Sequence, residues 1–354
     1  MSISLYTFKY FFGVPAKTLA VYRADTSGPN RKPYPGTDVP ADKRIDYLSH
    51  QEFLRALSGP GLAPTFRRFQ RALKTSSDKL GHSREWTDVP DFRKAFQDII
   101  GRPLIEAIYG TELLRLSPTF VDDLYEFDAN VPWLAREPLL LQRIRAELHN
   151  RFGGHNVRNV KPEELLGLPL LQSVYAETLR LYTEIYIMVS SSQADVGLGR
   201  WRLPKDSIGL LNSSMSHRDA RFWNTKDSLH PVDSFWADRF LIDPNDPSSG
   251  PINPAVREKL GIKMARQSRH TDGKPFFSTD GLEASWFPYG GGYSICPGRH
   301  LAKNVIILTC GILASEFDVE FLTDALRFDQ WRFGLGMATP KNPLPCRIKR
   351  RQYL

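Results

Sequence analysis

The sequence predicts a mainly α-helical protein with small β-sheets. Two stretches support the helical part of this prediction. In the first, Leu140, Ile144 and Leu148 recur at intervals of four residues and Gly153 follows, which is typical of a helix with one buried face and a glycine at its end. In the second, residues 298–317 are mostly apolar, as expected of a buried helix. The hydrophobic content of 41% and the charged content of 24% suit a globular protein with a sizeable core.

The N-terminal part of the chain is predicted to begin with a β-hairpin over residues 5–22, with a turn at the letters GVPA. A loop rich in Pro, Gly and Asp follows over residues 25–42. Helical patterns then continue through most of the next eighty residues. We expect these helices over residues 50–59, 64–80, 90–110 and 117–127.

The C-terminal part mixes helices with short strands. One helix is predicted from residue 162 to Tyr182, and a hairpin is predicted over residues 199–212 around the turn Pro204–Asp206. Residues 243–285 are rich in Pro, Ser, Gly and Asp, which indicates an irregular segment. A short strand is expected near the C-terminus.

Composition narrows the function only slightly. The net charge of +8 allows an acidic protein, an anionic membrane or nucleic acid as a partner, but on composition alone a solvated surface is the preferred explanation. The three cysteines (Cys296, Cys310 and Cys346) leave an odd thiol and have no zinc-type spacing, so a reducing, intracellular compartment is expected. No apolar run approaches the roughly 18 residues of a membrane span, and the N-terminus lacks the features of a signal peptide.

The stretch FPYGGGYSICPGRHLAK, residues 287–303, has the most chemical content. Cys296 precedes Pro297, a residue type that suits the first turn of a helix, so free N–H groups and the positive end of the helix dipole would face the sulfur. Both effects favour the thiolate, which is a nucleophile or a metal ligand. The glycines allow the loop to lie close to a flat, bulky group. The alternative is a glycine-rich turn with an incidental cysteine.

The spacing Tyr289-x-x-Gly292-x-x-x-Cys296-x-Gly298-x-x-x-Ala302 resembles the haem-binding signature of the cytochrome P-450 superfamily. Tyr289 stands where that signature has Phe, and Ser294 stands where a basic residue is common. The GGGxSICPGRHLAK form resembles the one in fungal members and in the sterol-hydroxylase and prostacyclin-synthase branch.

Two further motifs agree with this resemblance. Glu177 and Arg180 form a Glu-x-x-Arg pair, whose residues share one face of a helix. Downstream, FWADRF ending at Phe240 resembles the family's Phe-x-Pro-Glu-Arg-Phe segment and supplies Arg239, and SHRDARFWN, which contains His217, resembles a stretch that precedes it. The resemblance implies that Glu177, Arg180 and Arg239 form a buried structural cluster.

The resemblance implies a truncated cytochrome P-450 fold and a haem-thiolate monooxygenase. Cys296 would be the axial ligand of the iron of haem b, that is, iron protoporphyrin IX. Around the cofactor the resemblance places Tyr289, Gly290, Gly292, Gly298, Arg299 and His300. Arg299 and His300 lie where the family has a cation that reaches a haem propionate, although His300 is equally explained as an ordinary surface histidine. Cys310 and Cys346 are expected to be packing residues.

The implied partners are NADPH–cytochrome P-450 reductase, O₂ and a small apolar substrate (a lipid, a sterol or a secondary metabolite), and no nucleic acid. The implied location is the membrane face of the endoplasmic reticulum, with peripheral membrane contact. Some members of the family begin with a membrane-anchor helix. The sequence contains no such apolar helix, so no transmembrane segment is expected in it.

The family's long distal helix has no counterpart in this sequence, so no catalytic residue is identified. VDDLYEFDANVPWLAR joins EPLLLQRIRAELHNRFGG almost directly, which indicates a deletion near Arg136–Glu137. The prediction is a single domain over residues 1–354, with an N-terminal part at 1–136 and a haem-proximal part at 137–354. Residues 129–132 (Ala-Asn-Val-Pro) resemble an Asn-x-x-Pro variant of the missing helix only faintly, and no long helix is predicted around them.

Three alternatives to the monooxygenase stay open. The first is a catalytically impaired or non-catalytic truncated haem-binding protein, because the deletion removes the distal half of the site. The second is an isomerase of the same superfamily that rearranges peroxides without a reductase. The third is a hydrolase using Cys296 and His300, which leaves the motifs at Glu177 and Arg239 unexplained.

Overall fold

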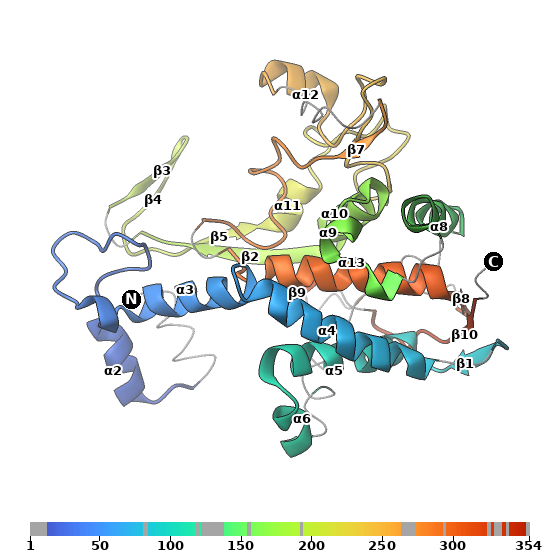
Figure 1. The fold of residues 1–354 in the computed structure, drawn as a ribbon. Coiled ribbons are helices and arrows are strands. Elements are labelled where there is room, and N and C mark those ends of the chain that lie inside the picture. The colour runs from blue at the N-terminus through green and yellow to red at the C-terminus, as the bar shows by residue number, and fades with distance from the viewer. Residues whose placement is uncertain are drawn as a thin grey trace. The chain divides into compact units, whose positions relative to one another are not determined.

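The computed structural model describes residues 13–80, 84–117, 121, 138–153, 157–191, 194–262, 273–292, 295–323, 327–328, 335–337 and 340–351. The chain falls into two compact units. Figure 1 draws the chain as a ribbon with its helices and strands labelled. Unit 1 comprises Met1–Leu62, Tyr186–Asn212 and Tyr289–His300. Unit 2 comprises Ala63–Ile185, Ser213–Pro288 and Leu301–Leu354. The predicted deletion near Arg136–Glu137 lies outside the described residues.

Unit 1 begins with helix α2 (Ala16–Ala24), followed by a loop, the 3-10 turn η1 (Ala41–Lys43) and helix α3 (Ile45–Leu57). The predicted Pro- and Gly-rich loop is ordered around the buried guanidinium of Arg44. This group donates hydrogen bonds to the carbonyl oxygens of Gly28 at 3.3 Å and Arg31 at 2.9 Å, and also to the carbonyl of Asn30. Backbone acceptors therefore stabilise the buried charge.

The prediction of a strand over residues 17–22 is wrong, because these residues lie in α2. Pro15 occupies the position before the first turn and is extended, where its missing N–H breaks no helical hydrogen bond. Leu19 is the buried residue of this helix. The other predicted strand of the hairpin falls on residues outside the described part of the chain.

The prediction of a hairpin over residues 199–212 is also wrong in its pairing. Strands β4 (Trp201–Leu203) and β5 (Gly209–Asn212) both exist, and the turn between them is present. However, β4 pairs with β3 (Val196–Leu198), and β5 pairs with the second half of β2 (Thr183–Val189). Gly199 connects β3 to β4 with a φ of 62°, a conformation that a tight two-residue hairpin turn requires.

Unit 2 is largely helical. The predicted helices at 64–80, 90–110 and 137–154 are confirmed as α4 (Leu62–Ser77), α5 (Phe92–Tyr109) and α8 (Pro138–Phe152). In its described residues this unit also contains helices α6 (Glu112–Leu116), α9 (Pro162–Leu165) and α10 (Pro169–Tyr182), with the 3-10 turns η2 (Asp78–Leu80) and η4 (Val157–Asn159).

The single helix predicted over residues 162–182 is in fact two helices, α9 and α10. Leu168 is extended between them, and Pro169 then begins α10. A proline cannot donate the hydrogen bond that a continuous helix would need, but it suits a helix start. Ten residues of α10 are buried, so this helix lies in the core of unit 2.

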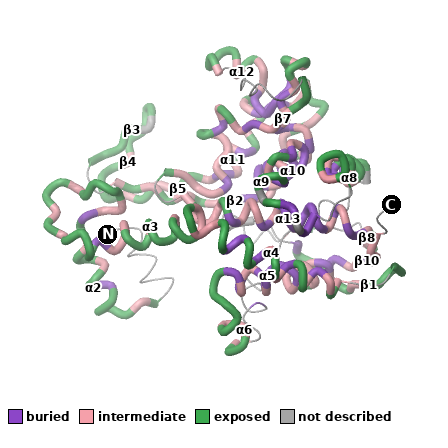
Figure 2. Tube along the Cα trace, viewed as in Figure 1, coloured by how far each residue is buried: buried purple, intermediate pink, exposed green. Residues whose placement is uncertain are grey.

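The later part of unit 2 contains short elements and one long helix. The segment predicted to be irregular over residues 243–285 carries two short elements in its described part, α12 (Pro254–Lys259) and β7 (Phe276–Phe277). Two more short elements, α11 (Ser213–His217) and β6 (Leu241–Ile242), precede it. The apolar run at 298–317 is confirmed as helix α13 (Arg299–Glu316), most of whose residues are buried (Figure 2).

Small antiparallel sheets complete unit 2. Strand β10 (Cys346–Arg350) lies between β1 (Thr87–Val89) and β8 (Phe317–Phe321), with Ile348 opposite Thr87 on one side and Val319 on the other. The first half of β2 pairs with β9 (Leu335–Met337), and β6 pairs with β7. None of the helices in the described part of the chain combines the length and apolar character that a bilayer crossing requires.

Candidate functional site

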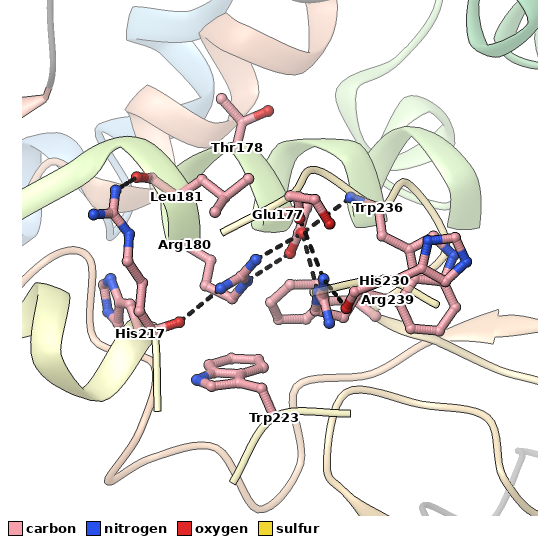
Figure 3. A network of polar contacts seen from close by, with 12 residues as sticks. Glu177, Thr178, Arg180, Leu181, His217, Trp223, His230, Trp236 and Arg239 are labelled. Atoms are coloured by element: carbon pink, nitrogen blue, oxygen red, sulfur yellow. Dashed lines mark hydrogen bonds and ion pairs between the residues drawn. The ribbon is translucent and has the colours of Figure 1, made fainter. Parts of the chain in front are cut away.

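Glu177, Arg180 and Arg239 are brought together in unit 2, as Figure 3 shows. Helix α10 presents Glu177 and Arg180 one turn apart on its buried face, and Arg239 comes from the segment just before β6. The side chains of all three are fully buried. The sequence therefore folds three charged groups into the interior, where each needs partners.

The carboxylate of Glu177 is the centre of this cluster. Its Oε2 accepts a hydrogen bond from Arg180 Nε at 2.7 Å, and its Oε1 accepts from Arg180 Nη2 at 2.9 Å. Oε1 also accepts from Arg239 Nε at 3.0 Å and from the backbone N–H of Trp236 at 3.1 Å. One carboxylate thus receives four hydrogen bonds, two of them in a bidentate pair with Arg180.

Backbone carbonyls accept hydrogen bonds from further N–H groups of the two arginines. Arg180 Nη1 donates to the carbonyl of His217 at 2.7 Å. Arg239 Nη1 donates to the carbonyl of Asn224, and its Nη2 donates to those of Pro231 at 3.2 Å and Ser234 at 3.3 Å. The cluster therefore fixes the backbone of residues 224–239 onto α10.

Aromatic side chains enclose this cluster. The Arg180 guanidinium lies 5.3 Å from the Trp223 ring centroid, and that of Arg239 lies 5.1 Å from the Trp236 ring centroid. Trp236 in turn stacks on His230, with centroids 4.4 Å apart and an interplanar angle of 7°. Burial against these rings lowers the pKa of Arg239, while Glu177 opposes that effect.

Unit 1 contains the loop of Cys296. The backbone N–H of Cys296 donates to the carbonyl of Tyr289 at 2.9 Å, which closes a loop of eight residues. Gly290 and Gly292 have φ values of 79° and 63°, in the left-handed region that favours glycine. A Cβ added at any of the three glycines from 290 to 292 would meet no atom within 4 Å.

Contacts within unit 1 hold the C-terminal side of the loop. The hydroxyl of Ser58 donates to the carbonyl of Pro297, and a Cβ at Gly298 would lie 3.7 Å from Leu57 and 3.8 Å from the sulfur of Cys296. Arg299 Nη1 donates to the Cys296 carbonyl at 2.9 Å. Helix α13 begins at Arg299, so the cysteine stands three residues before its first residue, close to the free N–H groups of the helix start.

The three cysteines lie in different environments. Cys296 is an exposed free thiol, whereas Cys310 and Cys346 are buried. Burial raises the pKa of Cys310 to about 12, and burial together with the charge of Asp91 raises that of Cys346 to about 12. The latter two therefore remain neutral thiols at physiological pH.

The other predicted site residues lie beside Cys296 in the same unit. Arg299 is half-buried and His300 is exposed in the first turn of α13. Tyr289 contributes its carbonyl to the bond that closes the loop. His50 of α3 lies near Arg299, and burial and that positive charge lower the pKa of His50. Ser294 lies outside the described residues.

Sequence reasoning missed how closely the backbone contributes to the Glu177 cluster. The sequence predicts for SHRDARFWN only a resemblance to a family motif. In the structure its His217 and Asn224 supply carbonyl acceptors to Arg180 and Arg239. The available signal was its position between the Glu-x-x-Arg pair and Arg239, since two buried arginines have more N–H groups than one carboxylate can accept.

Comparisons with known proteins agree with this fold. The structure of the heme domain of cytochrome P450DA matches with a TM-score of 0.58 over 96% of this chain and 81% of that chain, at 14% identity. Another cytochrome P450 crystal structure matches with a TM-score of 0.54 over 94% and 84%, at 15% identity. The fold is therefore that of a cytochrome P450.

Sequence comparisons give the family. The Cytochrome P450 family model matches residues 131–345. The chain is 41% identical to the cytochrome P450 monooxygenase efuG of Hormonema carpetanum, over 88% of this chain and 73% of that protein. It is 27% identical to the cytochrome P450 monooxygenase fsoE of Humicola fuscoatra, over 88% and 72%. The chain belongs to the cytochrome P450 family, a family of haem-dependent oxidoreductases, and these relatives are fungal monooxygenases.

The chain is shorter than these relatives within the matched stretch itself. The alignment with efuG spans 422 positions, whereas 88% of 354 residues is about 312, so about 110 positions have no residue in this chain. The alignment with fsoE spans 424 positions at the same coverage. A gap near Arg136–Glu137 remains a prediction, because the structure does not describe that junction.

The family implies a haem, O₂, a substrate and a redox partner, and the loop at Cys296 fits a haem. The described residues contain no group of three or more His, Cys, Asp or Glu side chains placed to hold a metal ion. A single exposed thiol suits a metal whose other ligands would come from a porphyrin. The open space beside the three glycines also suits a flat group lying close to the backbone.

Proposed function

We propose that this protein is a haem-thiolate monooxygenase in which Cys296 is the axial ligand of the iron of haem b. The observation that supports this most directly is that Cys296, alone among the three cysteines, is exposed, and it lies on a glycine loop at the start of α13. When bound, the haem would supply the chemistry of O₂ activation, leaving one oxygen atom in an organic substrate.

The neighbouring residues have distinct roles in this proposal. Gly290 and Gly292, with their left-handed conformations, would let the loop backbone lie close to a bound porphyrin. The Tyr289 carbonyl, by accepting the Cys296 N–H, fixes the turn that presents the sulfur. Gly298 leaves room beside the sulfur. Arg299 and His300 are the candidates to meet a haem propionate.

Glu177, Arg180 and Arg239 have a structural role in the proposal. Their hydrogen bonds hold residues 224–239 against α10, as described above. None of the three has a side chain exposed to a substrate. Their loss is therefore expected to reduce the folded population rather than to change the reaction.

The proposed electron donor is NADPH–cytochrome P-450 reductase at the membrane face of the endoplasmic reticulum. The net charge of +8 suits docking of an acidic partner protein. The proposed substrate is a small apolar molecule such as a lipid, a sterol or a secondary metabolite. This choice rests on the family, since no substrate-contacting residue follows from the geometry.

A spectrum of the ferrous carbon monoxide adduct tests the ligand assignment. The full chain, expressed with added haem precursor and then reduced, should give the strongly red-shifted Soret band of a thiolate-ligated haem. Cys296→Ala should abolish that band, whereas Cys310→Ala should keep it, because Cys310 is a buried neutral thiol. A thiolate-type band that survives in Cys296→Ala would refute the assignment.

A second candidate is a haem-binding protein without monooxygenase activity. The roughly 110 alignment positions without a residue in this chain favour it, because part of the relatives' fold has no counterpart here. Product formation in the presence of NADPH and a reductase separates the two candidates. Turnover of a peroxide without the reductase would instead indicate a reductase-independent isomerase.

A further inference from the structure

His217, the last residue of α11, has no exposed surface and contacts the chain just ahead of the Cys296 loop. Its Nε2 accepts a hydrogen bond from the backbone N–H of Phe287 at 3.1 Å. Its ring also lies against the ring of Phe287, with centroids 5.4 Å apart. His217 thus contacts both the backbone and the side chain of one residue in unit 2.

The short helix α11 is itself firmly held. The carbonyls at the end of a helix lack partners within the helix, and side chains satisfy two of them here. Arg180 donates to the carbonyl of His217 at 2.7 Å, and Trp223 Nε1 donates to that of Ser216 at 2.8 Å. The neighbouring Arg218 donates to the carbonyl of Leu181 at 2.6 Å. His217 is therefore fixed to α10 by its backbone and to Phe287 by its side chain.

Phe287 precedes Tyr289 by two residues, and Tyr289 accepts the hydrogen bond from Cys296 that closes the thiol loop. Gly290, which follows, is in the left-handed region and provides no side chain to fix the loop. The hydrogen bond from the Phe287 amide to His217 therefore fixes the backbone two residues before the loop begins.

We propose that His217 is a positioning residue for the Cys296 loop: its Nε2 fixes the Phe287 amide and thereby connects the Glu177–Arg180 cluster to the segment that presents the thiolate. This proposal rests on the proposed function only in treating Cys296 as the haem ligand. The contact between His217 and Phe287 does not depend on that assignment of Cys296.

The charge state of His217 suits this role. Only a neutral imidazole has a ring nitrogen that accepts a hydrogen bond, so the proton lies on Nδ1. Nδ1 faces the backbone carbonyls of Thr183 and Arg180 without a hydrogen bond of normal geometry. Burial first, and then the charge of Arg180 on α10, lower the pKa of His217 to about 4, with a smaller effect of Arg218, which pairs with Glu184 of β2.

Two substitutions separate a positioning role from simple filling of the core. His217→Gln places an amide oxygen about where Nε2 lies and keeps an acceptor for the Phe287 N–H. His217→Leu keeps comparable volume but has no acceptor. His230→Leu is the matched control, because it removes another ring next to the same cluster, one that stacks on Trp236 rather than on Phe287.

Hydrogen exchange of the Phe287 amide in the full chain is the direct measurement. We expect exchange to be about tenfold faster in His217→Leu, as for the loss of one buried hydrogen bond, and within about twofold of wild type in His217→Gln and His230→Leu. Amides in the middle of α13 report whether each variant remains folded. Unchanged protection in His217→Leu, or equal loss in both His217 variants, would overturn the proposal.

The carbon monoxide spectrum gives a second readout. In His217→Leu we expect the Soret band to shift from the thiolate position toward that of a neutral ligand, whereas His217→Gln keeps the thiolate band. A thiolate band of wild-type proportion in His217→Leu contradicts the proposal that His217 positions the Cys296 loop.

If the wild-type chain shows no thiolate band, the proposed function fails, and the exchange of the Phe287 amide still decides whether His217 holds that amide. Should His217→Leu not fold, exchange in His217→Gln decides alone: retained protection supports the proposal and lost protection overturns it.

Discussion

The Glu177 cluster of unit 2 and the Cys296 loop of unit 1 are built in opposite ways. In the cluster, Glu177, Arg180 and Arg239 are fully buried, and backbone carbonyls take up the arginine N–H groups that the carboxylate does not. In the loop, the thiol of Cys296 is exposed, and the space beside Gly290–Gly292 is open. The cluster depends on many mutual contacts, whereas the loop depends on backbone conformation and a few hydrogen bonds.

This difference separates stability from chemistry. Removing one charge from a buried network leaves other charges without partners, so the cost in folding free energy is large. Changing an exposed side chain on a loop has little effect on folding. The two regions are therefore expected to respond to mutation with different readouts, stability for the first and ligand binding for the second.

The largest effect is expected from Glu177→Gln. The substitution keeps the shape of the side chain but removes the negative charge shared by two buried guanidinium groups. We expect the free energy of unfolding to fall by about 3–5 kcal/mol, a large part of the stability of a typical domain. Urea denaturation followed by circular dichroism measures this change.

The same chain offers a matched control for this prediction. Glu112 and Arg115 form a second Glu-x-x-Arg pair in α6, with Arg115 Nε donating to Glu112 Oε2 at 2.8 Å. Both side chains are 68% exposed, so Glu112→Gln should change stability by less than about 0.5 kcal/mol. A similar loss of unfolding free energy in the two variants would show that burial does not determine how much the Glu177 cluster contributes to stability.

These two pairs also show how far the sequence alone could lead. Spacing places Glu and Arg on one helix face in both, but it does not reveal which face is buried, because burial depends on segments distant in the chain. Arg239 and the carbonyl of Asn224 complete the pair at Glu177, whereas among the described residues Glu112 has only its partner Arg115. The resemblance of FWADRF to a family motif identified Arg239 where periodicity could not.

Element prediction succeeded where local signals agreed. Helices α8 and α13 have long apolar patterns, and Gly153 after α8 adopts a left-handed φ of 58°. It failed for α2, a nine-residue helix with one buried residue, because so short an apolar pattern also fits a strand. The pairing of β3 with β4 was missed although the two-residue connection Gly199–Arg200 is a hairpin signal.

A medium effect is expected from pH. The folded chain holds the pKa of His217 at about 4 through burial and the charge of Arg180, whereas an unfolded histidine has a pKa of about 6.5. Between these values the unfolded chain binds a proton that the folded chain does not. The stability that His217 contributes is thus complete above pH 6.5 and falls by about 3 kcal/mol as the pH decreases to 4.

Unfolding titrations of wild type and His217→Gln between pH 7 and pH 4, at matched ionic strength, isolate this contribution. The free energy of unfolding of the wild type should decrease more steeply with falling pH, and the difference between the two proteins should shrink or change sign. Parallel curves for the two proteins would show that His217 does not titrate as its burial requires.

A smaller effect is expected within the loop itself. Gly290 has a φ of 79°, so Gly290→Ala should cost about 1 kcal/mol from backbone strain alone, although the added Cβ meets no atom within 4 Å. Gly291 lies in equally open space without a left-handed φ, so Gly291→Ala should be nearly neutral. Exchange of the Cys296 amide, whose bond to Tyr289 closes the loop, should be about fivefold faster in the first variant only. Equal exchange in both would show that the left-handed turn is not maintained in solution.

The smallest effect on folding is expected at the residue with the largest chemical role. Cys296 is exposed, so Cys296→Ala should change the unfolding free energy of the haem-free protein by less than about 0.5 kcal/mol. Added haem should raise the unfolding midpoint of the wild type with increasing concentration, because a ligand that binds only the folded state stabilises it by mass action. The same titration with Cys296→Ala should show a much smaller rise, while Cys310→Ala should follow the wild type in its response to haem. A large loss of stability in haem-free Cys296→Ala would mean that the loop depends on packing of this side chain, as the Glu177 cluster does, and the contrast between the two regions would then be lost.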